Sequence, residues 1–385
     1  MNRSAGPRII IAAGEASGDL HAAHLVEALR AHIPNASFRG FGGARLEEVG
    51  VELREDLVEH SVMGFLPVLR SLGGIFGTIA RFEEEFRTDP PDLLIVVDYP
   101  GLNLNLARLA RAHGVTVVAY ICPQVWAWAP WRIGRVARRA DLLLVILPFE
   151  EEIYAAVHPR VRFVGNPVFD HLASQDVGET ERGELAEGGT RCLALLPGSR
   201  RQEVNANLGP QLRVAAALQA VDPTFRVWVS CQRPALRASI EAQIAAAPIE
   251  ARVFPGSTHE LQRRADLALV CSGTATLEQA WYGAPMVVMY AADELERSLF
   301  ELFAVAPHFA LVNLFAGREV VPEILFTPGD EEEVVRRAKP LIAGPERQRV
   351  IEDLRRLRKD RFIGGAAEHA ATEIADFLRD RGRIG

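Results

Sequence analysis

The sequence predicts an α/β fold built from two parallel β-sheets, each covered by helices. Short apolar runs of strand length alternate with helical patterns almost throughout the 385 residues, and this alternation is typical of parallel sheets. A chain of this length exceeds one typical hydrophobic core, so two domains are expected. Residues 174–190 are rich in Gly, Glu, Asp and Ser, and we interpret them as a linker or a surface loop at the domain boundary.

Composition and charge are those of a soluble globular protein. Hydrophobic residues make up 49% of the chain and charged residues 24%, which is ordinary for this class. The net charge of −7 argues against a general nucleic-acid binder. No apolar run reaches the roughly 18 residues of a membrane-spanning helix. The four cysteines are far apart in apolar runs, so we expect reduced thiols in a cytosolic protein and no structural zinc site.

The first half of the chain is predicted to form one sheet. The expected strands are residues 8–13, 37–41, 91–97, 115–122, 142–147 and 161–164. Residues 14–19 are predicted to be a turn, followed by a helix from Asp19 to about His32. This turn lacks the GxGxxG and P-loop patterns, so it predicts neither a dinucleotide site nor a Walker site.

Asp98 is a candidate catalytic residue because it directly follows the apolar strand 91–97. The carboxyl end of a parallel strand is where α/β folds place their chemistry. A carboxylate whose pKa is raised by burial can act there as a general base. The alternative is an Asx turn that leads into a helix over residues 102–112, and the residue type alone does not separate the two.

Residues 61–86 are far more apolar than a typical surface helix. Their apolar side chains include Val62, Met63, Phe65, Leu66, Leu69, Leu72 and Phe76. One interpretation is a buried helix pair, which composition alone favours. The other is an exposed patch that contacts lipid or a membrane.

Residues 123–132 hold three of the five tryptophans, and arginines follow them. The basic residues are Arg132, Arg135, Arg138 and Arg139. This combination indicates an interface with sugar, lipid or an anionic head group. The alternative is a packed corner of the core beside a solvated basic helix face.

The second half restarts the strand–turn–helix pattern. Its expected strands are residues 191–196, 225–230, 252–254, 267–270 and 286–290. Residues 309–326 are expected to form a polar loop between apolar runs, which can present amides and carboxylates at a cleft. Residues 331–381 are expected to form charged amphipathic helices, the last of which is free to cross back onto the first domain.

Two turns of this half are suited to bind phosphate. Ser272, Gly273 and Thr274 lie between a strand and a helix, where amides lack intrahelical partners and the helix dipole is positive. Glu278, about one turn later, can accept hydrogen bonds from ribose hydroxyls. An ordinary capped helix is the alternative for this turn. In the other turn, Gly198 and Ser199 precede Arg200, whose side chain can pair bidentately with phosphate oxygens.

In their order along the chain, these motifs resemble the lipid-A-disaccharide synthase family, which has the two-domain glycosyltransferase architecture called GT-B. The matching runs are Gly14–Leu20, Ser61–Phe65, Pro123–Trp128, Leu147–Glu150, Leu196–Arg200, Ser272–Glu278 and Leu314–Glu323. The resemblance implies two Rossmann-like domains whose parallel sheets face a central cleft. Residues 1–170, with a crossing helix at about 362–385, would bind the acceptor, and residues 171–361 would bind the UDP-sugar.

The resemblance also implies the reaction. The family transfers 2,3-diacylglucosamine from its UDP derivative to 2,3-diacylglucosamine 1-phosphate, which gives a β-1,6-linked lipid A disaccharide 1-phosphate and UDP. This hexosyl transfer, a step of lipopolysaccharide biosynthesis, inverts the anomeric centre and uses no metal or cofactor. The implied location is cytoplasmic, peripheral on the cytoplasmic face of the inner membrane. A homodimer is left open.

Residue roles follow from the same resemblance. Asp98 matches the essential aspartate of the family and would take the proton of the acceptor. The donor-binding residues would be Ser199, Arg200, Ser272, Gly273, Thr274, Glu278 and Asn313, of which several stabilise the departing diphosphate. The acceptor phosphate is expected near Glu15, Ser17 and Asp19. The apolar stretch 61–82 becomes a candidate acyl-chain or membrane-docking surface.

The chain departs from the family pattern at several positions near the expected cleft. Asn166 replaces a histidine, Ala291 replaces a basic residue, and Ala310-Leu311-Val312 stands where the family has Ser-Leu-Pro, so that Ala310 and Val312 differ from the pattern and Leu311 keeps it. These departures bear on substrate detail and rate more than on the reaction class. Two alternatives stay open: another UDP-sugar enzyme of this architecture, such as a 2-epimerase, and a nucleotide-binding peripheral membrane protein without catalysis.

Overall fold

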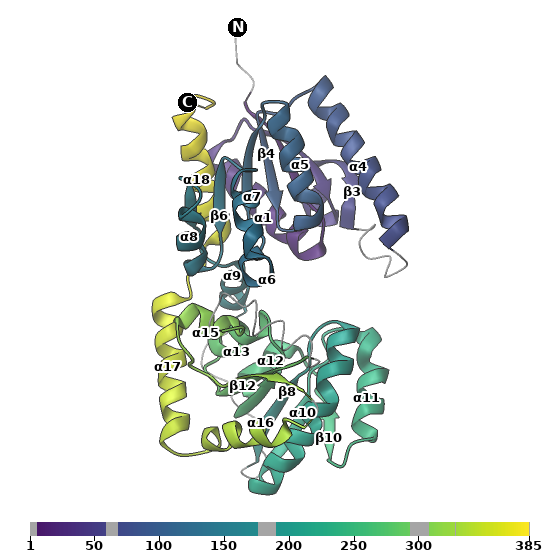
Figure 1. Cartoon of the computed structure of the whole chain (residues 1–385), viewed down its shortest axis with the longest axis vertical. Coiled ribbons are helices and arrows are strands. Elements are labelled where there is room, and N and C mark those ends of the chain that lie inside the picture. The colour runs from purple at the N-terminus through teal and green to yellow at the C-terminus, as the bar shows by residue number, and fades with distance from the viewer. Residues whose placement is uncertain (1–5, 59–67, 176–189, 293–307, 328, 385) are drawn as a thin grey trace. The chain divides into compact units, whose positions relative to one another are not determined.

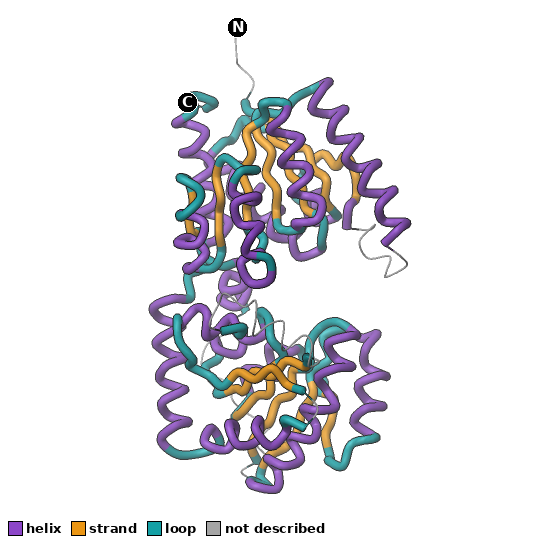
Figure 2. The backbone as a smooth tube through the Cα atoms, in the orientation of Figure 1, coloured by secondary structure: helices purple, strands orange, loops and turns teal. Residues whose placement is uncertain are grey.

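The fold is taken from a computed structural model, which describes residues 6–58, 68–175, 190–292, 308–327 and 329–384. For residues 68–76, 100 and 128 it describes the backbone alone. The chain divides into two compact units, residues Met1–Pro167 with Ile363–Gly385 (unit 1) and residues Val168–Phe362 (unit 2). Each unit contains one parallel sheet covered by helices (Figure 2), so the predicted fold class is confirmed.

Unit 1 is built on a seven-stranded sheet with the order β3-β2-β1-β4-β5-β6-β7. The strands are β1 (Arg8–Ala13), β2 (Ser37–Gly42), β3 (Glu52–Asp56), β4 (Leu93–Val97), β5 (Thr116–Tyr120), β6 (Leu142–Val145) and β7 (Val161–Phe163). The strand order reverses between β1 and β4, and Ala13 pairs with Val97 at the last position of both strands. The chain therefore leaves both strands at the edge where open α/β sheets bind their ligands.

The helices of unit 1 cover both faces of this sheet. They are α1 (Ala16–His32), α2 (Ala44–Glu48), α4 (Val68–Thr88), α5 (Pro100–Ala112), α6 (Val125–Trp128), η1 (Pro130–Arg132), α7 (Ile133–Ala137), α8 (Pro148–Ala155) and α18 (Ala366–Asp380). Side chains alternate between the faces of a strand. Val97 accordingly packs in the cluster that contains α1 and α18, whereas Val96 lines a hollow with α5 and α7.

The C-terminal helix α18 returns to unit 1, as the sequence predicts. It packs along α1 (Figure 1). Ile374 and Leu378 are fully buried in the same cluster as Leu25 and Leu29 of α1. Residues that are hundreds of positions apart in the sequence therefore share one core, and the apolar face of α1 is covered only because the chain comes back.

Unit 2 contains a six-stranded sheet with the order β10-β9-β8-β11-β12-β13. The strands are β8 (Arg191–Leu196), β9 (Phe225–Val229), β10 (Ala251–Val253), β11 (Leu267–Val270), β12 (Met286–Ala291) and β13 (Glu323–Phe326). The helices are α9 (Pro167–Ser174), α10 (Arg201–Val221), η3 (Pro234–Leu236), α11 (Arg237–Ala245), α12 (Thr258–Arg264), α13 (Ala275–Trp281), α15 (Leu311–Ala316), α16 (Glu331–Ala338), η4 (Lys339–Leu341) and α17 (Pro345–Arg361). α9 begins at the last residue of unit 1.

The structure differs from the sequence prediction in several elements. β3 was not predicted, because an edge strand tolerates the charged sequence of residues 52–56. Residues 309–326 are not a plain loop, since they contain α15 and β13. The units divide before α9 because Phe169 stacks on Trp281 and Phe362 of unit 2, with ring centroids 5.9 and 4.3 Å away. Most of the predicted linker, residues 176–189, lies outside the described residues.

None of the described helices combines the length and the apolar character that a membrane span requires.

The packing of α18 predicts a stability effect. Ile374→Ala should lower the free energy of unfolding of unit 1 by about 2–5 kcal/mol, because it leaves a cavity under a fully buried side chain. The control Asp376→Ala removes an exposed ion pair with Arg379 on the same helix and should cost less than about 1 kcal/mol. Hydrogen exchange along β1 and α1 during urea titration measures both. Equal effects of the two variants would contradict this packing.

Candidate active site

Asp98 lies at the end of β4, in an unusual backbone conformation. Asp98 and Tyr99 both have a φ of 48°, and Ile121, which follows β5, has a φ of 57°. These are the non-glycine residues with positive φ in the described part of the chain. Side chains are strained in this region, and such strain persists where the surroundings enforce it, commonly at active sites. All three follow the neighbouring strands β4 and β5, so the strain is concentrated around Asp98.

The side-chain amide of Asn103 holds this conformation in place. Its Nδ2 donates to the carbonyl oxygens of Asp98 at 2.6 Å, Val97 at 2.9 Å and Ala12 at 3.4 Å. Asn103 is 2% exposed, and it links α5 to the ends of β1 and β4. Sequence reasoning missed this residue. Its one local signal is a polar side chain near the start of an otherwise apolar helix.

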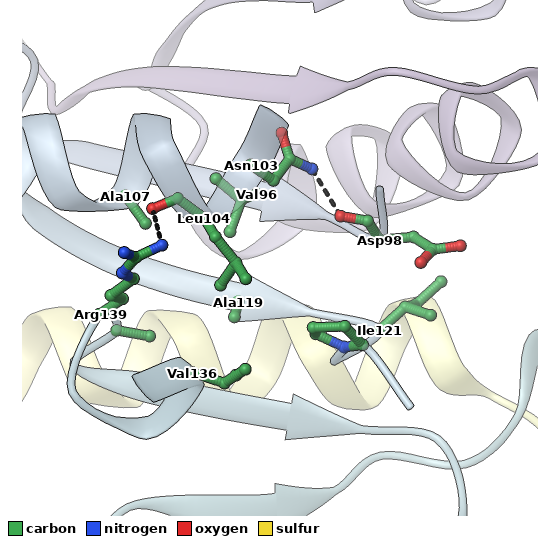
Figure 3. A pocket seen from close by; sticks show the side chains of 11 residues that line it. Val96, Asp98, Asn103, Leu104, Ala107, Ala119, Ile121, Val136 and Arg139 are labelled. Carbon is green, nitrogen blue, oxygen red and sulfur yellow. Dashed lines mark hydrogen bonds between the residues drawn. The ribbon is translucent and has the colours of Figure 1, made fainter. Parts of the chain in front are cut away.

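A hollow of about 330 Å³, partly open to solvent, lies beside Asp98 (Figure 3). Its lining is mostly apolar and consists of Val96, Asp98, Asn103, Leu104, Ala107, Ala119, Ile121, Pro123, Val136, Arg139 and Ala140. In Figure 3 the backbone carbonyl of Asp98 faces Asn103, and its carboxylate extends to the other side. Burial in these surroundings raises the pKa of the Asp98 carboxyl, and the charge of Glu15 raises it further, against a hydrogen bond from the Tyr99 amide. A raised pKa is what a general base needs.

The turn after β1 is packed against this site. A Cβ atom at Gly14 would lie 2.2 Å from Cδ1 of Tyr99, so only glycine permits the close approach. α1 begins at Ala16, so the prediction of a turn through residue 19 was wrong, and Ser17 lies in the first helical turn. Glu15 and Ser17 are exposed and remain candidates to contact a ligand.

Asp19 has a structural role that the sequence did not reveal. It is 2% exposed, and its two oxygens accept hydrogen bonds from the amides of Gly43 at 2.8 Å and Arg45 at 2.9 Å. These amides belong to the start of α2, where a carboxylate satisfies unpaired donors. The carboxylate of Asp19 is thus already engaged, and any effect on an acceptor phosphate must be indirect.

Glu150 is a second buried carboxyl near Asp98. It is fully buried, and it accepts hydrogen bonds from Nε1 of Trp126 at 2.8 Å and the amide of Leu147 at 3.2 Å. Burial raises the pKa of Glu150 from an ordinary 4.5 to about 7, with a smaller contribution from the charge of Asp98. Tyr154 donates to the carbonyl of Pro123 at 2.8 Å. The loop that lines the hollow is therefore fastened to α8.

The tryptophan-rich segment, residues 123–132, has one part that is packed in the core and one part that is exposed, so each of the two sequence interpretations fits part of it. Trp126 is 4% exposed and packs edge-on against Phe149, as a core corner does. Trp131 is 72% exposed. The side chain of Trp128 lies outside the described part of the structure.

In unit 2, the two predicted phosphate turns lie side by side. They follow the neighbouring strands β8 and β11, where Leu196 pairs with Val270. The amides of Gly273, Thr274 and Ala275 form no hydrogen bond with any described residue. Gly273 has a φ of +126° and open space where a Cβ would be. Amides that point into free space at the start of a helix can bind an anion.

The turn after β8 differs from the prediction. Its backbone was expected to be free for an anion, but the amides of Ser199 and Arg200 donate to Oε2 of Glu203 at 2.9 and 3.1 Å. This part of the prediction was wrong, because a protein carboxylate occupies the place at which the turn would hold a phosphate. The Arg200 side chain is 72% exposed and lies 3.4 Å from Oε1 of Glu203, so its guanidinium remains accessible.

Asn207 connects the two turns and was not identified from the sequence. It is 2% exposed. Its Nδ2 donates to the carbonyls of Glu203 at 2.8 Å and Pro197 at 3.3 Å and contacts Sγ of Cys271 at 3.4 Å. Its Oδ1 accepts from the amide of Ala291 at 2.9 Å. One amide side chain thus fixes the ends of β8, β11 and β12 relative to one another.

Glu278 and Asn313 occupy different environments. Glu278 is half-buried on α13 and accepts a hydrogen bond from Gln262 at 3.2 Å. Asn313 is fully buried, and its side chain bonds the backbone of Val320 and Val321 at 2.8–3.1 Å. Its amide is therefore used to shape the loop after α15. Ser272 donates from Oγ to the carbonyl of Phe309 at 3.3 Å, which joins this region to the glycine turn.

The predicted apolar surface falls on residues that the structure does not fully describe. Val62, Met63, Phe65 and Leu66 lie outside the described residues. Leu69, Leu72 and Phe76 belong to α4, of which only the backbone is described at these positions. Within the described ranges, no three His, Cys, Asp or Glu side chains are grouped so that they could hold a metal ion.

Solved structures that are similar to this chain include a UDP-N-acetylglucosamine 2-epimerase from Neisseria meningitidis and the calicheamicin glycosyltransferase CalG4. The S. aureus MnaA–UDP complex has a TM-score of 0.67 at 14% identity, with 97% of each chain covered. Acinetobacter baumannii MurG has a TM-score of 0.59 at 14% identity, with 97% of this chain and 99% of that chain covered. At this identity the likeness shows the fold alone. The fold is that of the GT-B glycosyltransferases and related epimerases.

The sequence comparisons identify the family. A profile described as lipid-A-disaccharide synthetase matches residues 9–374. The lipid-A-disaccharide synthase of Syntrophus aciditrophicus is 37% identical over 96% of this chain and 98% of its own. That of Myxococcus xanthus is 38% identical over 97% of this chain and 98% of its own. The chain belongs to the lipid-A-disaccharide synthase family, as the sequence motifs indicated.

Two departures from the family pattern have visible structural roles. Asn166 donates from its backbone to Ile363 at 2.8 Å and from its side chain to Ile146 at 3.2 Å, which fastens the return of the chain into unit 1. Ala291 contributes its backbone amide to Asn207. Leu311 and Val312 begin α15. At Asn166 and Ala291, the contacts that the structure shows therefore stabilise the fold.

The environment of Glu150 predicts an infrared signature. A protonated carboxyl band should be present at about pH 6, where an unperturbed glutamate is ionised, and should disappear as the pH rises through about 7. The folded pKa lies above the unfolded one, so between about pH 4.5 and pH 7 the unfolded chain loses this proton while the folded protein keeps it. The free energy of unfolding should therefore decrease as the pH rises through this range. Glu150→Gln should abolish the band, and the control Asp98→Asn should retain it. A band that persists in Glu150→Gln belongs to another group and refutes the assignment.

Proposed function

We propose that this protein transfers 2,3-diacylglucosamine from UDP-2,3-diacylglucosamine to the 6-hydroxyl of 2,3-diacylglucosamine 1-phosphate. The products are UDP and the β-1,6-linked lipid A disaccharide 1-phosphate. Family membership over nearly the whole chain supports the reaction. The observation that carries the mechanism is Asp98, a carboxylate of raised pKa at the end of a central strand.

Asp98 acts as the general base. In its ionised form it accepts the proton of the acceptor 6-hydroxyl as that oxygen attacks the anomeric carbon. The bond from this carbon to the diphosphate oxygen breaks in the same displacement, so the configuration inverts. The proton remains on Asp98 until it is released to water. Proton removal of this kind contributes roughly 10²–10⁴-fold to a rate.

The departing diphosphate is stabilised in unit 2. The unpaired amides of Gly273, Thr274 and Ala275 donate to its oxygens as charge develops there. The guanidinium of Arg200 exchanges its long contact with Glu203 for the diphosphate, which it can bind bidentately. Ser199 and Ser272 support the two turns, and Glu278 accepts hydrogen bonds from the ribose. Asn313 contributes by holding the loop after α15.

The substrates imply a membrane surface. Both proposed substrates carry acyl chains, so the protein acts as a cytoplasmic, peripheral protein on the cytoplasmic face of the inner membrane. Glu15 and Ser17, next to Asp98, contact the acceptor. The apolar sequence of residues 62–76 contacts acyl chains or the bilayer. A homodimer stays a prediction, which sedimentation velocity tests.

Asp98→Asn tests the proposed base. The variant should lower kcat by more than roughly a hundredfold, since an amide cannot take the proton. Its affinity for UDP, measured by calorimetry, should match that of the wild type, because the nucleotide site lies in unit 2. Disaccharide formation by the variant at the wild-type rate would exclude Asp98 as the base. If the wild type instead converts non-acylated UDP-N-acetylglucosamine, an epimerase is favoured.

The raised pKa of Asp98 predicts how the activity depends on pH. Activity requires the ionised form, so kcat/KM should fall as the pH decreases through this pKa, at a higher pH than for an ordinary aspartate. Glu15→Gln removes a charge that raises the pKa, so it should move the acidic limb to lower pH. An acidic limb at the same pH in both proteins would show that Asp98 does not control it.

Gly273→Ala tests the anion site. The new side chain meets no neighbour but is strained at a φ of +126°, so the turn must change and its amides must move. UDP affinity should fall roughly tenfold or more, a loss of about 1.4 kcal/mol. The matched control is Gly283→Ala, which is strained in the same way at a φ of +71° just beyond α13. Unchanged UDP affinity in Gly273→Ala would place the diphosphate elsewhere.

A further inference from the structure

One region of unit 1 has an excess of positive charge that the proposed reaction does not use. Residues 99–140 contain six arginines and no aspartate or glutamate, although the whole chain has a net charge of −7. Arg111 forms an ion pair with Asp141 at 2.8 Å. Such a local concentration of one charge in an acidic protein marks a surface for an anionic partner.

The six arginines lie on two neighbouring segments: Arg108 and Arg111 on α5, and the other four in η1, in α7 and in the turn directly after α7. α5 and α7 cover the same face of the sheet, because both line the hollow beside Asp98, and Figure 1 shows them next to each other. Burial lowers the pKa of Arg139, and four neighbouring positive charges lower it further. These are the charges of Arg135, Arg108, Arg132 and Arg138. Each of these four guanidiniums therefore repels that of Arg139.

Three of these arginines have no counterion among the described residues. The side chains of Arg108, Arg135 and Arg138 are exposed and form no ion pair or hydrogen bond with any described residue. Arg139 is held by the carbonyl of Leu104 at 2.8 Å, which is a neutral partner. The charges of Arg108, Arg135 and Arg138 are therefore not paired with acidic side chains of the described residues, and an external anion would relieve their repulsion of Arg139.

Trp131 lies directly beside this cluster. Its side chain is 72% exposed, the highest value among the large hydrophobic side chains that the structure describes as exposed. η1 holds it at the start of α7, immediately before Arg132. An exposed indole next to guanidiniums is typical of proteins at the boundary between water and lipid, where tryptophan places its ring among the head groups.

We propose that η1, α7 and the adjacent side of α5 form a docking surface for an anionic phospholipid bilayer, with Trp131 inserted among the head groups. The choice of a bilayer rests on the proposed function, which brings lipid-linked substrates to this unit. Arg108, Arg135 and Arg138 are exposed and lie on separate segments, which suits a planar array of phosphates more than one enclosed phosphate. α5 also packs against α4, whose first turns carry part of the apolar sequence predicted to contact lipid.

Sedimentation with vesicles tests this surface. The full-length protein should bind vesicles of phosphatidylcholine mixed with phosphatidylglycerol and should not bind vesicles of phosphatidylcholine alone. Arg135→Ser/Arg138→Ser should weaken binding to the anionic vesicles roughly tenfold or more, since each arginine near such a surface contributes about fivefold. Trp131→Ser should weaken it as well. Added salt should weaken wild-type binding more than that of the double variant.

The matched control is Arg45→Ser/Arg379→Ser. It makes the same change in net charge at exposed positions of α2 and α18, on the opposite face of the sheet, and should bind vesicles as the wild type does. Equal loss in the control and the Arg135→Ser/Arg138→Ser variant would overturn the proposal, because it would show a net-charge effect. Wild-type binding that ignores phosphatidylglycerol, or an Arg135→Ser/Arg138→Ser variant that binds anionic vesicles as the wild type does, would overturn it too.

An assay with detergent-dispersed substrates separates this proposal from the proposed function. The Arg135→Ser/Arg138→Ser and Trp131→Ser variants should form disaccharide at the wild-type rate in detergent, where no bilayer is needed. Normal detergent activity with unchanged vesicle binding in these variants would refute the docking surface and leave the reaction intact. Absence of disaccharide from the wild type in the same assay would refute the reaction, whatever the vesicles show.

Discussion

The conformation of two residues after β4 determines what unit 1 can do. Asp98 and Tyr99 both adopt left-handed backbone angles, which few side chains tolerate. Asn103 holds the carbonyl of Asp98, and Gly14 leaves room for the ring of Tyr99. Without these two partners the chain would relax and the carboxylate would leave its position. The core of α1, β1 and α18 supports the same strand ends from the other face of the sheet.

In unit 2, the turns after the neighbouring strands β8 and β11 differ in whether their backbone amides are available to a ligand. At one turn a carboxylate from Glu203 satisfies the amides. At the next turn the amides of Gly273, Thr274 and Ala275 bond to none of the residues that the structure describes. Asn207 fixes the two turns relative to each other. The same local pattern of strand, small residues and helix therefore produces one closed turn and one open turn. Only the open one offers backbone donors to a diphosphate, and the closed one contributes the side chain of Arg200.

The sequence was sufficient for features that depend on local periodicity or on motif order. Alternating apolar and amphipathic runs predicted both sheets, and the position after strand 91–97 singled out Asp98. The roles of Asn103, Asn207 and Glu150 could not be predicted, because each depends on which distant carbonyls or amides the fold brings within hydrogen-bonding distance. Asp19 is an example of the opposite error. The family motif suggested that it contacts the acceptor, but its carboxylate is buried and accepts hydrogen bonds from amides at the start of α2. The charged edge strand β3 has no apolar periodicity to reveal it.

We propose that one displacement, assisted by the carboxylate of Asp98, joins the two acylated sugars. The most direct measurement is the identity of the product formed from UDP-2,3-diacylglucosamine and 2,3-diacylglucosamine 1-phosphate, by mass spectrometry and by the anomeric coupling constant in NMR. The account predicts a disaccharide 1-phosphate with a β-1,6 linkage and one UDP released for each disaccharide. An α linkage, or UDP released without any disaccharide, would contradict it.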